Sequence, residues 1–201
     1  MPDELPVKVV FLPGLRGHVE DHWQTRLARL YPNSVTVPPL SENGLSRLAR
    51  VENLARTLQS ISIPVVIVAH SAGCMILAHW ASGHVEGQVV AALLATPADL
   101  ETPLPPGYPT ISDLADGKWL PVPKSRLPFP TLLAASRNDP LCSYSNACEL
   151  AKSWGSRVED LGEVGHLNPV AGFGDWPAGK VLIDRMLSLE KDRTGIERSA
   201  D

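Results

Sequence analysis

Residues 63–73 read IPVVIVAHSAG, and this stretch decides the class of fold. Its first seven residues, Ile63 to Ala69, are a nearly continuous run of valine and isoleucine, which is typical of a strand buried on both faces of a sheet. The next residues open a stretch with helical spacing that reaches about Trp80. A doubly buried strand that leads directly into a helix indicates a parallel sheet covered by helices on both sides.

The same alternation of strand and helix extends over most of the chain. The predicted strands cover residues 7–12, 34–37, 63–69, 88–95, 131–136 and 157–161, and the predicted helices cover about 23–30, 44–60, 71–80, 143–154 and 177–189. We therefore predict an α/β fold, a three-layer αβα sandwich around a mainly parallel sheet of about six strands. Residues 1–189 are expected to form one domain without a large lid domain. The charged residues 190–201 are expected to form a disordered tail.

Nine prolines interrupt this alternation within residues 96–130, which we call the Pro-rich segment. Proline lacks a backbone donor and breaks helix interiors, so the segment is expected to be mostly loop, with one helical turn near Ile111–Leu114. Loops of this length in a compact domain are usually functional or disordered.

Composition excludes several classes of function. The chain has 201 residues, and its 18 Lys and Arg against 22 Asp and Glu give a net charge of −4 without a basic block, so nucleic acid is not an expected partner. The longest wholly apolar run, Val89 to Ala95, has seven residues, and a membrane-spanning helix needs about 20. No signal-peptide pattern is present, and three cysteines, Cys74, Cys142 and Cys148, match no disulfide framework or zinc motif. We expect a cytoplasmic protein without a metal or cofactor.

Residues 69–73, AHSAG, match the sharp turn that presents a nucleophilic serine between a strand and a helix. Because the turn is tight, the residues two before and two after the serine must be small, and here they are Ala69 and Gly73. Ser71 would lie at a helix N-terminus, where free N–H groups favour developing negative charge. The alternative is that Ser71 only caps the helix.

A serine nucleophile needs a base, normally a histidine that a carboxylate orients. In this type of fold the order along the chain is serine, acid, histidine. Asp139 follows the strand that ends at Ser136, and His166 follows the strand that ends at Leu161. Taken alone, Asp139 could be a turn residue and His166 a surface-loop histidine. Their order behind Ser71 favours a catalytic triad.

The tetrahedral intermediate of acyl transfer needs backbone donors for its oxyanion. We expect one donor at the N–H of Ala72, the residue after the serine. The other is expected at Leu15, with Gly14 as the second choice, in the loop PGLRG (residues 13–17) after the first strand. That loop could also be an ordinary strand-to-helix turn. It lacks the lysine and the glycine spacing of a phosphate-binding loop.

The walls of a substrate pocket are expected from segments beside these residues. His18 follows the glycine loop, and His70 precedes the serine, although His70 could simply be a packed neighbour. Trp119 and Leu120 are the candidates in the Pro-rich segment. The alternative for Trp119 is a loop aromatic that packs over a helix.

Together these segments resemble the α/β-hydrolase fold and, more narrowly, a small lidless family, the retinoblastoma-binding protein nine and YdeN-like serine hydrolases. The resemblance is carried by the Pro-Gly loop and the following His-Trp pair, the HSAG turn, and the segments SRNDP and GHLN, and it covers about residues 7–189. It implies that Ser71 is the nucleophile, Asp139 the acid and His166 the base. It also implies a compact sheet that lacks the first two strands of larger hydrolases.

Two departures from the family pattern matter. Ala69 stands where glycine is usual in the serine turn. The L-x-C-x-E pattern that retinoblastoma-type partners read does not occur in the sequence, so the resemblance implies no such partner.

We therefore expect a serine hydrolase that cleaves an ester-like or amide bond of a small molecule, in the simplest case a carboxylesterase. A thioesterase or a peptidase would use the same triad. The other alternative is a non-enzymatic binding protein on a hydrolase scaffold, with the Pro-rich segment as its partner surface.

Overall fold

The computed structural model describes residues 7–17, 19–83 and 87–198, and the side chains among them up to Leu189. At its centre lies a six-stranded sheet in the order β2-β1-β3-β4-β5-β6, with every neighbouring pair parallel. The strands are β1 (Lys8–Leu12), β2 (Val35–Thr36), β3 (Val65–His70), β4 (Val89–Ala95), β5 (Thr131–Ala135) and β6 (Arg157–Asp160). The predicted α/β class is confirmed.

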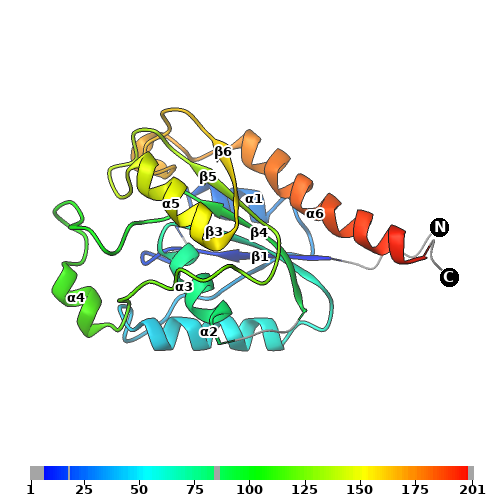
Figure 1. The fold of residues 1–201 in the computed structure, drawn as a ribbon, viewed down its shortest axis with the longest axis horizontal. Helices are drawn as coiled ribbons and strands as arrows, with labels where there is room; N and C mark the ends of the chain where they lie inside the picture. Colours follow the sequence, from blue (N-terminus) through cyan, green and yellow to red (C-terminus); the bar gives the residue numbers. More distant parts are fainter. Residues whose placement is uncertain (1–6, 18, 84–86, 199–201) are drawn as a thin grey trace.

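Helices cover both faces of the sheet (Figure 1). One face carries α1 (Trp23–Ala28) and α6 (Pro177–Arg198), and the other carries α2 (Arg47–Gln59), α3 (Ala72–Ala81) and α5 (Tyr144–Trp154). The Pro-rich segment contains the short helix α4 (Ile111–Asp116), and a 3-10 turn, η1 (Pro169–Ala171), follows β6. The result is the three-layer sandwich that the sequence predicts.

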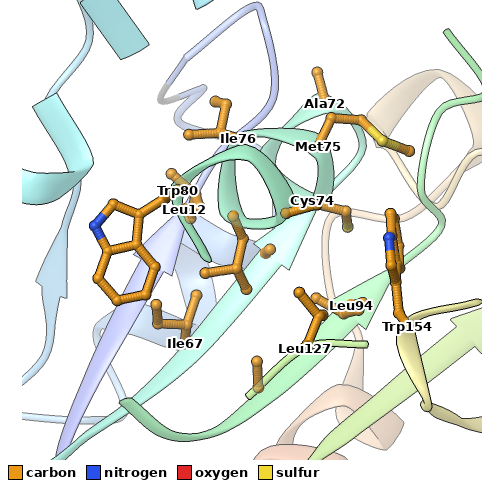
Figure 2. Packing of buried hydrophobic residues seen from close by; sticks show 14 of the residues in the cluster. Leu12, Ile67, Ala72, Cys74, Met75, Ile76, Trp80, Leu94, Leu127 and Trp154 are labelled. Atoms are coloured by element: carbon orange, nitrogen blue, oxygen red, sulfur yellow. The ribbon is translucent and has the colours of Figure 1, made fainter. Parts of the chain in front are cut away.

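Alternate residues of each central strand enter opposite cores. In β1, Val10 and Leu12 pack toward α2 and α3, whereas Val9 and Phe11 pack toward α1 and α6. This two-sided burial is the reason that the strands read as continuous apolar runs. Figure 2 shows side chains of α3 packed over Leu12, and over residues of β3 and β4.

The chain order places a topological switch point between β1 and β3. From β1 the chain moves to the edge strand β2, then returns to the other side of β1 and continues outward from β3 to β6. In open parallel sheets, ligands bind at the carboxyl ends of the strands beside such a point. The loops after β1 and β3 are therefore where a site is expected.

The two edges of the sheet differ from its centre. β2 has only two residues, and β6 reads RVED, so three of its four residues are charged. The central strands β3 and β4 are fully buried along their whole length.

Two helix ends differ from the expectation. α1 ends at Ala28, and Leu30, which the helical spacing placed on the buried face, lies beyond the helix with 57% of its surface exposed. α6 continues through Arg198, although the sequence led us to expect a disordered tail from residue 190. Glutamate, lysine and arginine favour helix, so a high density of charge does not by itself end one.

None of the helices in the described part of the chain combines the length and apolar character that crossing a bilayer requires. The three cysteines are free, with Cys74 and Cys142 buried and Cys148 half-buried. Burial raises the pKa of the Cys74 thiol and raises that of Cys142 to about 12, so both stay protonated near neutral pH.

Candidate active site

Three loops at the carboxyl ends of β3, β5 and β6 bring Ser71, Asp139 and His166 together. His166 Nε2 lies 2.8 Å from Ser71 Oγ, and His166 Nδ1 lies 2.9 and 3.0 Å from the two carboxylate oxygens of Asp139. Because a carboxylate only accepts, Nδ1 carries the proton and donates it to Asp139. In the neutral ring Nε2 is then the acceptor for the Ser71 hydroxyl.

The backbone at Ser71 is forced into a strained conformation by the turn from β3 into α3. Its φ of +57° and ψ of −128° lie in a region that residues with a side chain seldom adopt. The residue occupies the N-cap position of α3, yet its hydroxyl makes no capping hydrogen bond. The alternative role as a simple helix cap is therefore not what the structure shows.

Small residues permit this turn, as the sequence pattern requires. A Cβ on Gly73 would collide with the carbonyl oxygen of Leu12 and would lie 3.0 Å from that of Pro13. Ala69 is fully buried between β1 and β4, where it pairs with Leu12 and Leu94. Alanine in place of the usual glycine is accommodated at this position.

Asp139 performs two tasks. Its side chain is 2% exposed, and besides the His166 ring, its Oδ1 accepts a hydrogen bond from the Leu141 N–H at 2.8 Å. The turn role that the sequence left open is therefore real, and it coexists with the contact to His166. The second hydrogen bond fixes the carboxylate that orients the ring.

The loop that carries His166 is fixed through its main chain. The residues on either side have positive φ angles, +57° at Gly165 and +48° at Leu167. Asn138 Oδ1 accepts from the Gly165 N–H at 2.7 Å, and Trp23 Nε1 donates to the Leu167 carbonyl at 2.9 Å. Trp23 is fully buried, so this core residue supports the loop of the candidate base.

His70 packs beside His166 and is not a second base. Its Nε2 lies 3.0 Å from the carbonyl oxygen of His166, which can only accept, so this nitrogen carries the proton. Burial, followed by repulsion from the rings of His166 and His22, lowers the pKa of His70 well below its usual value. The neutral imidazole holds the His166 backbone and also lines the cavity described below.

The residues expected to bind an oxyanion lie beside the serine. An ideal Cβ on Gly14 would be 3.1 Å from Ser71 Cβ and 3.4 Å from Oγ, so this backbone passes the hydroxyl closely. Leu15 and Ala72 both line the cavity. Among the backbone hydrogen bonds of loops, turns and caps in the described residues, none is donated by the N–H of Leu15 or of Ala72. Ala72 is also the first residue of α3, where an N–H group has no acceptor within the helix.

A cavity of about 480 Å³ opens above Ser71. Its walls are largely apolar and come from the β1–α1 loop, the region before α2, the Pro-rich segment and η1. Residues of these walls include Leu15, Val19, Leu45, Leu100, Leu104, Tyr108 and Val170. A pocket of this size and character suits a small organic molecule.

The Pro-rich segment contributes to the cavity, but not through the two residues proposed for it. Trp119 is fully buried in the core, and its Nε1 donates to the Leu45 carbonyl at 2.7 Å. Leu120 packs against the same core. Neither lines the cavity. A large indole with its N–H satisfied is stable in the interior, so the alternative of a packed aromatic is correct for Trp119. His18 lies outside the described residues.

Sequence reasoning missed several residues that line the cavity. Arg50 reaches it from α2, Tyr108 from the Pro-rich segment and Val170 from η1. Arg50 belongs to an ordinary amphipathic helix, and no local motif separates it from a surface arginine. Tyr108 lies in a part of the Pro-rich segment where the prolines prevent a prediction of the backbone path from the sequence. The described residues contain no cluster of His, Cys, Asp and Glu suited to hold a metal ion.

The model of the serine hydrolase family matches residues 9–185, and the chain belongs to that family. Its structure is similar to that of a YdeN-like hydrolase from Pectobacterium atrosepticum, with 27% sequence identity, a TM-score of 0.75 and 91% of each chain covered. The ydeN gene product of B. subtilis is 17% identical with a TM-score of 0.68, over 91% of this chain and 100% of the other.

Est1E from Butyrivibrio proteoclasticus shares the fold at 12% identity, with a TM-score of 0.66 over 93% of this chain and 90% of the other. No curated protein sequence matches the chain. The expected family and fold, including the lack of a large lid domain, are confirmed by these matches.

Proposed function

We propose that the protein is a carboxylesterase that hydrolyses small esters through an acyl-enzyme on Ser71, with His166 as base and Asp139 as the orienting acid. The observation that carries this proposal is the continuous hydrogen-bond chain from Asp139 through His166 to the Ser71 hydroxyl. This series of hydrogen bonds ends at Ser71, which lines an apolar cavity that is open to a substrate. A serine used only for structure would not need a buried imidazole and carboxylate behind it.

The acylation step follows from these contacts. Ser71 Oγ attacks the ester carbonyl carbon while its proton passes to His166 Nε2. The carbonyl oxygen becomes an oxyanion that accepts from the N–H groups of Leu15 and Ala72. The bond from the carbon to the leaving oxygen then breaks, and that oxygen takes the proton from Nε2 and departs as an alcohol.

Deacylation repeats the sequence with water. His166 Nε2 takes a proton from water as the water oxygen attacks the acyl carbon. The bond from the carbon to Ser71 Oγ breaks, Oγ recovers the proton, and a carboxylic acid leaves. Asp139 stabilises the imidazolium at both stages because its carboxylate faces Nδ1.

The cavity favours short, uncharged acyl groups. A volume of about 480 Å³ is at the lower end of ligand pockets, and apolar side chains form most of its wall. We expect kcat/KM for p-nitrophenyl esters to be highest for short chains such as butyrate. For the dodecanoate it should fall by at least about tenfold.

The primary test is labelling of the purified protein with a fluorophosphonate probe, with the adduct located by mass spectrometry. We expect a single adduct on Ser71 that is absent in Ser71→Ala and His166→Ala. Ser82→Ala, at the exposed opposite end of α3, should label like the wild type. A folded protein without an adduct would exclude an activated serine and favour the binding-protein alternative.

A panel of substrates with matched acyl groups separates the esterase from the other hydrolases that use this triad. The oxygen ester, the thioester and the anilide of butyrate are compared by kcat/KM. Preference for the oxygen ester is expected. A higher value for the thioester or the anilide would replace the carboxylesterase assignment with a thioesterase or a peptidase.

A further inference from the structure

Arg50 makes an unusual set of contacts beside the cavity. It projects from α2, is half-buried and lines the cavity wall. Its guanidinium donates to three backbone carbonyls, from Nε to Gly44 at 2.6 Å, from Nη1 to Gly14 at 3.4 Å and from Nη2 to Leu15 at 2.8 Å. It therefore links the helix to the loop that passes Ser71.

Arg50 has no carboxylate partner within salt-bridge distance in the described part of the chain. Several other arginines have one, including Arg26, Arg137 and Arg185. Burial lowers the pKa of Arg50, but a guanidinium stays charged at physiological pH. Arg50 is a partly buried cation whose hydrogen bonds go to backbone carbonyls and not to a counter-ion. This arrangement indicates that Arg50 fixes the position of those carbonyls.

The geometry of the Gly14–Leu15 peptide connects this contact to the chemistry. In a planar trans peptide the C=O and the N–H point in opposite directions. The Gly14 carbonyl is held by Arg50 Nη1 and by the Gly17 N–H at 3.1 Å. The Leu15 N–H must therefore point away from both donors. It belongs to the stretch that passes within contact distance of Ser71.

We propose that Arg50 is the positioning residue of the oxyanion hole, and that it holds the Gly14–Leu15 peptide so that the Leu15 N–H faces the developing oxyanion. This proposal rests on the esterase function proposed above. Donation to the Gly14 carbonyl also polarises the peptide, which makes the Leu15 N–H a stronger donor. The fork of the guanidinium is essential, since three carbonyls in different directions are bound at once.

Substitution of Arg50 by lysine and by methionine distinguishes the effect of the forked guanidinium from the effects of its charge and of its packing. Arg50→Lys keeps the charge but has a single ammonium that cannot reach all three carbonyls. Arg50→Met keeps an apolar stem and removes every donor. Arg56→Met is the matched control, because Arg56 is an exposed arginine on the same helix whose ion pair with Glu52 spans 4.0 Å.

The measurements are designed to detect a weaker oxyanion hole and not only a weaker fold. We measure kcat and KM for p-nitrophenyl butyrate, the midpoint of thermal unfolding, and the inhibition constants of two analogues. One is a trifluoromethyl ketone with a butyl chain, which forms an oxyanion on Ser71. The other is the corresponding alcohol, which occupies the cavity without forming one.

For Arg50→Met we expect kcat to fall by about 10²-fold, because loss of one oxyanion donor costs about that much. Inhibition by the ketone should weaken by a similar factor, while KM and inhibition by the alcohol stay within about twofold. Arg50→Lys should lose most of the same activity, and Arg56→Met should lose none. If Arg50→Met does not fold, Arg50→Lys decides.

The outcomes separate this proposal from the function on which it rests. An active, labelled wild type with an unchanged kcat in Arg50→Lys or Arg50→Met would overturn the role of Arg50 and leave the esterase intact. Equal losses for the ketone and the alcohol would show that Arg50 shapes the cavity and not the oxyanion hole. A wild type that is neither labelled nor active would overturn both.

Discussion

Ser71, Gly73 and Gly14 show how few atoms fix the geometry of the candidate nucleophile. The serine takes a backbone conformation with positive φ, and the space for it exists because neighbouring residues lack side chains at two close approaches. The five-residue motif predicts the strained serine and the small residues beside it. The backbone that Gly73 approaches belongs to the distant loop after β1, which the motif does not identify. Ser71, Asp139 and His166 could be predicted because each lies in the loop that follows a strand, in the chain order expected of a triad.

Gly73→Ala should destabilise the fold. The new Cβ would collide with the Leu12 carbonyl in a buried backbone that cannot move aside, so the free energy of unfolding should fall by about 1–3 kcal/mol. Urea denaturation measures the change. Gly87→Ala is the control, because nothing lies near its Cβ, and it should stay within about 0.5 kcal/mol. Equal stability of the two variants would contradict the collision.

Asp139→Asn should remove activity without removing binding. An asparagine can present an N–H to His166 Nδ1, which favours the tautomer with the proton on Nε2, and that nitrogen then cannot take a proton from Ser71. We expect kcat to fall by about 10⁴-fold with KM little changed. Steady-state kinetics test this, with Asp184→Asn on α6 as a remote control. A loss below tenfold would exclude the orienting role.

His70 should make the fold sensitive to acid. The pKa of His70 is lowered in the folded protein. Below about pH 6.5 the histidine therefore binds a proton in the unfolded chain but stays neutral in the folded protein. Stability is therefore lost as the pH falls below that value. His70→Gln keeps a donor for the His166 carbonyl but does not titrate. Its free energy of unfolding should fall less steeply between pH 6.5 and 5, by up to about 1.4 kcal/mol per pH unit. Parallel curves would rule out His70 as the source.

At the scale of elements, strands were more predictable than the loops that build the cavity. Each predicted strand matches an observed one within two residues. For the central strands the reason is burial on both faces, which leaves a dense apolar signal. The cavity wall is assembled from α2, the Pro-rich segment and η1, which are far apart along the chain. A local sequence pattern cannot predict which distant segments come together. For that reason the sequence did not identify Arg50 as a residue of the cavity wall.

The Pro-rich segment is fixed at its centre by Trp119. The indole is fully buried and donates a hydrogen bond to the carbonyl of Leu45, and Trp119 itself does not line the cavity. Trp119→Phe keeps most of the apolar contact and loses this hydrogen bond, so the free energy of unfolding should fall by about 1–2 kcal/mol.

In the same variant, kcat/KM for p-nitrophenyl butyrate should stay within about threefold of the wild type, since Trp119 does not line the cavity. Leu104→Ala, which enlarges the cavity, is the comparison and should shift preference toward longer acyl chains. A large change in chain-length preference for Trp119→Phe would return Trp119 to the substrate pocket.

For the whole molecule, α6 closes one face of the sheet with a small number of buried side chains. Leu182, Ile183 and Met186 lie in the core with α1, whereas residues 190–198 form the last turns of the helix. Full burial of three such side chains contributes roughly 5–9 kcal/mol, which is comparable to the whole stability of a typical domain.

Truncation tests where the domain ends. A chain ending at Leu189 should keep its activity, and its free energy of unfolding should stay within about 1 kcal/mol of the full chain. A chain ending at Lys180 should not fold. Circular dichroism and urea denaturation distinguish the two. If the chain that ends at Leu189 were unfolded, residues 190–201 would belong to the domain.

The edges of the sheet have a consequence for the protein at high concentration. An unpaired edge strand is a template on which a second copy can continue the sheet, and such pairing is how many β-containing proteins begin to aggregate. Here one edge offers only the two residues of β2, and the other offers the charged tetrapeptide RVED. A second copy that docked on β6 would have to cover charged side chains and remove their water, which disfavours pairing at this edge. The sheet is therefore terminated by its own sequence, and crowded molecules can collide without being joined into fibrils through these strands.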